Sequence, residues 1–141
     1  MKKITVLVAV CIAASIGSKA QCDKPMKWTS SKSDFLDTAG NFQRSNAETV
    51  DVTTTPKKIS IVRNNSDKQL MSGDVTSFSC NWKDKKNGKA SIKAVLVEPG
   101  GKTRNATITI EEVNGKTTIL LEAPEENTKI RLNVDSYEEA N

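Results

Sequence analysis

The segment from residue 89 to residue 97 reads KASIKAVLV, and its side chains Ala90, Ile92, Ala94 and Leu96 fall on every second position. Successive side chains of a β-strand point to opposite faces, so this period of two places the four residues on one face. The other face carries serine and two lysines together with valine. The segment therefore predicts a strand with one buried and one solvated face, which is typical of an antiparallel sheet.

The same alternation continues on both sides of this segment. Ile108 and Ile110 alternate with threonines, and Leu132 and Val134 alternate with arginine and asparagine. No stretch of the chain after the first 20 residues carries a long apolar stripe with helical spacing. We expect strands over residues 27–36, 48–53, 58–63, about 74–83, 89–97, 104–113, 116–123 and 128–135.

The connections between these segments are rich in turn-forming residues. Asn87-Gly88 and Asn114-Gly115 suit the type I′ hairpin turn, which requires positive φ at both central residues. A polar loop is expected over residues 37–41. Successive hairpins need no crossover, so the sequence predicts an all-β fold, an antiparallel up-and-down meander of about eight strands. The apolar face must be covered, and the sheet closes into a barrel or forms a barrel-like sandwich.

The first 20 residues have the pattern of a bacterial secretory signal peptide. Lysines at positions 2 and 3 precede an apolar run over residues 4–17, and Ala20 supplies a small residue for cleavage. The run of 14 residues is short of the about 20 that span a bilayer. We expect residues 1–20 to be a signal peptide and 21–141 a single exported domain, periplasmic or secreted, with no integral membrane segment after cleavage.

Removal of this leader changes the charge of the protein. The full chain has a net charge of +4, and loss of Lys2, Lys3 and Lys19 lowers it to +1 because every acidic residue lies later. Nucleic-acid-binding proteins keep a strong basic excess and often interleave it with aromatic residues. We therefore expect no nucleic-acid partner.

Cys22 and Cys80 are the two cysteines that follow the predicted cleavage site. An exported protein can keep a disulfide, and a bridge between them would stabilise the fold by about 2–4 kcal/mol. The alternative is that Cys80 is a buried small side chain and Cys22 a free thiol. The chain contains no histidine, which argues against a structural zinc site.

The absence of histidine also restricts catalysis. It excludes Ser-His-Asp and Cys-His arrangements and histidine metal sites. Paired glutamates occur at 111–112, 125–126 and 138–139, positions expected at a strand end, a turn and the tail, where they keep the protein soluble. We expect a protein that is not an enzyme and needs no cofactor.

The strand pattern and Trp28, near the start of the first expected strand, make the chain resemble the lipocalin-type barrels. In that family a tryptophan of a Gly-x-Trp motif closes one end of the barrel, often under an arginine from late in the chain. This sequence has Met26-Lys27-Trp28 without the glycine. The resemblance implies a barrel closed by Trp28, with Arg131 as its cover.

Two functional hypotheses follow from these observations. The first is a binding protein whose barrel encloses a small apolar ligand. The second is a structural or interaction module with a filled core that binds an envelope protein. The residues expected to line the interior and contact a ligand are Trp28, Phe78, Trp82, Ile92 and Leu96.

Overall fold

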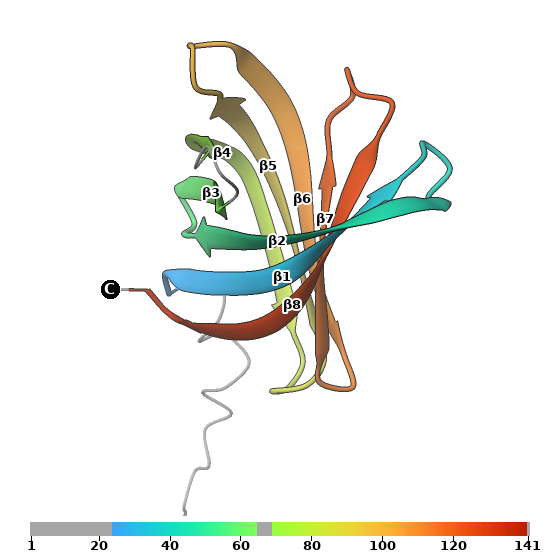
Figure 1. Ribbon diagram of the computed structural model, residues 1–141. Coiled ribbons are helices and arrows are strands. Elements are labelled where there is room, and N and C mark those ends of the chain that lie inside the picture. Colours follow the sequence, from blue (N-terminus) through green and yellow to red (C-terminus); the bar gives the residue numbers. More distant parts are fainter. Residues whose placement is uncertain (1–23, 65–68, 141) are drawn as a thin grey trace, which may run out of the picture.

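A computed structural model describes residues 24–64 and 69–140 of the protein, and these residues form an eight-stranded antiparallel barrel (Figure 1). Each strand pairs with its neighbours in the chain, and β1 also pairs with β8, so the meander closes as predicted. The predicted signal peptide and Cys22 lie outside the described residues. The strands are β1 (Met26–Leu36), β2 (Phe42–Thr54), β3 (Lys58–Asn64), β4 (Gln69–Trp82), β5 (Gly88–Val97), β6 (Thr103–Val113), β7 (Lys116–Glu122) and β8 (Lys129–Glu139).

Several strands are longer than their sequence patterns indicated. β2 begins at Phe42, where we expected a strand from residue 48, and β8 continues to Glu139. The start of β2 pairs with the end of β1, and Leu36 lies opposite Phe42. Backbone hydrogen bonds between strands form whatever the side chains are, so a largely exposed segment can be a strand without apolar alternation.

One of the two Asn-Gly turns has the predicted geometry. Asn114 and Gly115 have φ of 52° and 81°, as a type I′ turn requires. The prediction was wrong at the other site, where the turn spans residues 83–87 and Gly88 begins β5. Gly88 lies opposite Trp82 in the β4–β5 pairing, and a Cβ atom at this position would overlap the indole ring.

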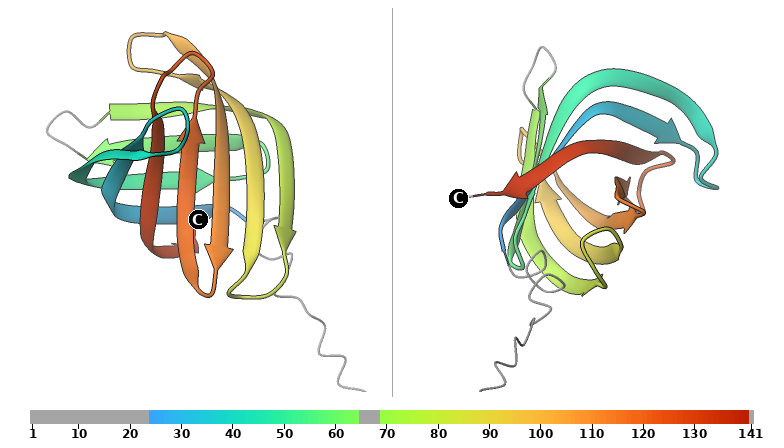
Figure 2. Two further views of the ribbon diagram at one scale, coloured as in Figure 1. Left: turned by 90° about the vertical axis from the view of Figure 1, so that its right-hand side faces the viewer. Right: turned by 90° about the horizontal axis from the view of Figure 1, so that it is seen from below.

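Several shifts of register interrupt the strand pairing and bend the strands. β1 shifts register between Ser30 and Lys32, and β4 shifts between Val75 and Ser77. At the first shift the Ser30 hydroxyl donates to the Lys32 carbonyl at 2.8 Å and accepts from its amide at 3.3 Å. Bulges increase local twist and curvature. Figures 1 and 2 show β1–β3 running across the direction of β5–β7, which the bent strands permit.

The inward side chains form one continuous core. All strands contribute, and the members in the middle of the barrel are almost completely buried. This confirms the alternation on which the fold was predicted. The largest fully buried apolar side chains are Ile59, Ile61, Ile92, Ile108, Ile110, Ile119, Leu132, Val50 and Val52.

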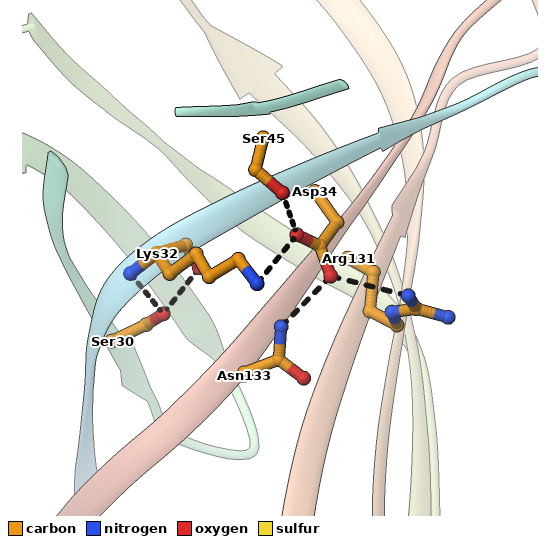
Figure 3. A network of polar contacts seen from close by, with 6 residues as sticks. All are labelled: Ser30, Lys32, Asp34, Ser45, Arg131 and Asn133. Atoms are coloured by element: carbon orange, nitrogen blue, oxygen red, sulfur yellow. Dashed lines mark hydrogen bonds and ion pairs between the residues drawn. The ribbon is translucent and has the colours of Figure 1, made fainter. Parts of the chain in front are cut away.

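A buried carboxylate links β1, β2 and β8 through side-chain hydrogen bonds (Figure 3). Asp34 on β1 accepts hydrogen bonds from Ser45 at 2.6 Å, Asn133 at 2.9 Å and Arg131 at 3.1 Å, and Lys32 Nζ lies 3.7 Å away. The Ser45 bond is the main cause that lowers the pKa of Asp34 to about 2; Asn133, Arg131 and Lys32 lower it further, against the opposing effect of burial. The ionised side chain therefore joins three strands where the barrel closes.

Asp34→Asn tests how much the ionised carboxylate of Asp34 contributes to stability. The lower pKa of Asp34 in the folded state, about 2 against 3.8, means that its ionised form stabilises the protein fully above about pH 4 and that this contribution is lost as the pH falls towards 2. We expect the variant to lose about 2 kcal/mol of unfolding free energy at pH 7 and little at pH 2. Urea denaturation at both pH values measures this. Asp135→Asn, at an exposed position of β8, is the matched control. An equal loss at both pH values would contradict the assigned pKa.

Candidate functional site

The two ends of the barrel differ, and one is closed by aromatic rings. Trp28 on β1 lies with its ring centroid 4.8 Å from that of Tyr137 on β8 and 6.2 Å from that of Trp82 on β4. The Trp28 indole N–H donates to Thr54 Oγ1 at 3.1 Å. The space left among the side chains at this end is only about 10 Å³, so this end is packed.

A buried glutamate lies beside the aromatic rings. Glu112 on β6 is 4% exposed, and Tyr137 Oη lies 3.4 and 3.5 Å from its carboxylate oxygens. Trp82 Nε1 faces the same carboxylate but has no partner in good hydrogen-bond geometry among the described residues. Burial raises the pKa of Glu112, with a smaller contribution from Asp84, and the contacts with Tyr137, Trp82 and Thr117 oppose the rise.

The opposite end holds a cavity of about 380 Å³. It lies where β1, β5 and β7 end and where β2, β6 and β8 begin. Figure 2 shows the β5–β6 and β7–β8 connections next to each other at this end. The volume is within the range of about 300–1,000 Å³ that is usual for small-molecule sites. Its apolar lining residues are Phe35, Ile61, Met71, Leu96, Ala106, Leu121, Ala123 and Ile130.

Charged side chains surround the mouth of this cavity. Arg104 lies between Glu98 and Glu126 and forms an ion pair with each. These pairs link the end of β5 to the β7–β8 connection across β6.

Two further ion pairs and one cation–π contact involve residues that line the cavity. Arg63 donates two hydrogen bonds to Glu48 from Nη2, at 2.9 and 3.0 Å, and one from Nε at 3.2 Å. Lys129 Nζ lies 3.2 Å from Glu122. Arg44 places its guanidinium carbon 4.3 Å from the centroid of the Phe35 ring.

The residues expected to contact a ligand separate into two groups. Leu96 lines the large cavity. Trp28, Phe78, Trp82 and Ile92 lie together around the small space at the closed end. The structure does not test ligand contact by any of the five, and this role stays a prediction.

The sequence reasoning missed most of the cavity lining. Leu121 and Ile130 lie opposite each other on β7 and β8. Both are inward positions near strand ends, and this pattern was the only sequence signal that pointed to them. Phe35 gave no such signal, because the bulge in β1 shifts its register.

The structure corrects one implication of the lipocalin resemblance. Arg131 does not cover Trp28 but bonds to Asp34. The residue opposite Trp28 on β8 is Tyr137, and its ring packs against the indole. An aromatic contact thus takes the place that the resemblance assigned to an arginine.

The predicted disulfide is untested because Cys22 lies outside the described residues. Cys80 lies half-buried in β4, packed against the core. Among residues 24–64 and 69–140, no group of three or more histidine, cysteine, aspartate or glutamate side chains could hold a metal ion. The same residues contain no helix long and apolar enough to cross a membrane.

Comparison with known proteins adds no family assignment. No protein-family model matches the sequence, and neither the curated proteins nor the solved structures gave a match. The fold and the two ends therefore define the class: an eight-stranded up-and-down β-barrel, packed with aromatic residues at one end and hollow at the other.

Glu112→Gln tests the electrostatics of the closed end. A raised pKa means that ionised Glu112 destabilises the fold. This cost is absent below its ordinary pKa of 4.5, grows as the pH rises from there to the raised value, and stays constant above it. We expect the variant to raise Tm at pH 8 and to leave it unchanged at pH 4. Thermal unfolding followed by circular dichroism measures both. Glu111→Gln, at the exposed neighbouring position, is the control. A gain of the same size at pH 4 would rule out charge burial as its cause.

Proposed function

We propose that this protein is an exported, non-enzymatic binding protein that holds a small, largely apolar ligand at the open end of its barrel. The observation that supports the proposal is the cavity of about 380 Å³ with its apolar lining. A space of this size lined by apolar side chains gains hydrophobic free energy when a ligand replaces its water. Export is supported by the signal-peptide pattern, and a non-enzymatic role by the lack of histidine.

The alternative is a filled-core module that binds an envelope protein. The packed closed end fits that alternative, because only about 10 Å³ is left there. The open end favours ligand binding, since Ala106 on β6 and Ala123, directly after β7, line it with small side chains. Larger residues at these positions would fill the interior and remove the cavity.

Binding of phenylnaphthylamine, a neutral apolar fluorophore, tests the proposal. We expect saturable one-to-one binding, with a rise in fluorescence as the dye leaves water. Ala106→Trp puts an indole into the cavity, and we expect it to weaken binding by about tenfold or more. Asn105→Trp adds the same side chain at the exposed neighbouring position and should bind like the wild type.

Circular dichroism should show both variants folded. Failure of the folded wild-type protein to bind the dye would count against the proposed function. Equal binding by wild type and Ala106→Trp would place the dye outside the cavity and would also contradict it.

A further inference from the structure

The chemistry of the ligand is indicated by one cation at the mouth of the cavity. Arg44, near the start of β2, lies directly opposite Phe35 on β1, and both residues line the cavity. Its guanidinium packs over the ring, with 4.3 Å between the guanidinium carbon and the ring centroid. A stacked guanidinium keeps its N–H donors at the edge of its plane, where they can bind a planar or tetrahedral anion.

The other charged residues that line the cavity are already paired. Arg63 is bound to Glu48, Arg104 lies between two carboxylates, and Glu122 is paired with Lys129. Within the part of the chain that the structure describes, Arg44 forms no ion pair. Carboxylates neutralise the charge of the other two arginines, whereas the guanidinium of Arg44 is open to a ligand or to water.

The charges around the mouth also indicate how a bound anion would be oriented in the cavity. Glu98 and Glu126 share the single positive charge of Arg104, so this side of the mouth has an excess of negative charge. The Arg44 side carries the compensating positive charge. An anion is repelled from the first side and attracted to the second, because like charges disfavour each other at short range.

From these observations we infer that the ligand is an anionic amphiphile, with an apolar body in the cavity and a carboxylate, sulfonate or phosphate group bound by Arg44. The inference rests on the proposed function, since it names the ligand class of the same cavity. Arg44 is solvent-exposed, which places the anionic group at the entrance, where it keeps part of its hydration. The apolar body extends inward towards Leu96 and Leu121.

Two dyes that share a ring system and differ in one charged group test the inference. Phenylnaphthylamine is neutral, and anilinonaphthalene sulfonate is the same aromatic amine with a sulfonate. We expect the wild type to bind the sulfonate about tenfold more tightly than the neutral dye. This preference should shrink as the salt concentration rises from about 0.01 to about 1 M, because salt screens exposed charges.

Substitution of Arg44 identifies the group responsible. Arg44→Gln should weaken binding of the sulfonate by about tenfold and change binding of the neutral dye by less than about twofold. Lys93→Gln removes the same charge from an exposed position on the outer face of β5 and should leave both affinities unchanged. Arg44→Lys should keep part of the preference, since it retains the charge but not the guanidinium geometry.

The outcomes separate this inference from the proposed function. Binding of the neutral dye without preference for the sulfonate overturns the anionic ligand class and leaves the apolar cavity site standing. Equal loss of sulfonate binding in Arg44→Gln and Lys93→Gln assigns the preference to net charge and overturns the role of Arg44. Absence of binding by either dye contradicts the proposed function itself.

Discussion

The pairing of β1 with β8 is the constraint on which the rest of the structure depends. A meander of eight strands leaves an open edge on its first and last strand, and here those two edges bond to each other. The closure gives the backbone groups of both edges their partners and turns the apolar faces inward. Asp34 on β1 reinforces it with side-chain bonds to Arg131 and Asn133 on β8.

Closure creates an interior with two ends, and the size of the inward side chains determines how much space is left at each end. Trp28, Trp82 and Tyr137 meet at one end and leave almost no space, and Gly88 makes room for the Trp82 ring. At the other end small and medium-sized apolar side chains leave about 380 Å³. The barrel is therefore packed at one end and hollow at the other.

The two buried carboxylates show how partners decide the effect of burial. Asp34 accepts short hydrogen bonds from three side chains, and these outweigh the cost of removing its charge from water. The contacts of Glu112 with Tyr137, Trp82 and Thr117 do not outweigh the cost of burial, so its pKa rises; the distances to Tyr137 are 3.4 and 3.5 Å. The first strengthens the fold at neutral pH, and the second weakens it there.

The sequence by itself determined the local features of this protein. Alternation such as Ala90, Ile92, Ala94 and Leu96 depends only on the two-residue period of a strand, and the Asn114-Gly115 turn depends only on backbone sterics. The barrel as a class followed from consecutive hairpins. Only the tertiary structure decided that Arg131 bonds to Asp34, that Gly88 packs against Trp82, and that one end is hollow. The Arg131–Asp34 bond and the hollow end depend on the register and bulges of strands distant in sequence. The Gly88–Trp82 contact depends on the register of the β4–β5 hairpin, which apolar alternation does not encode.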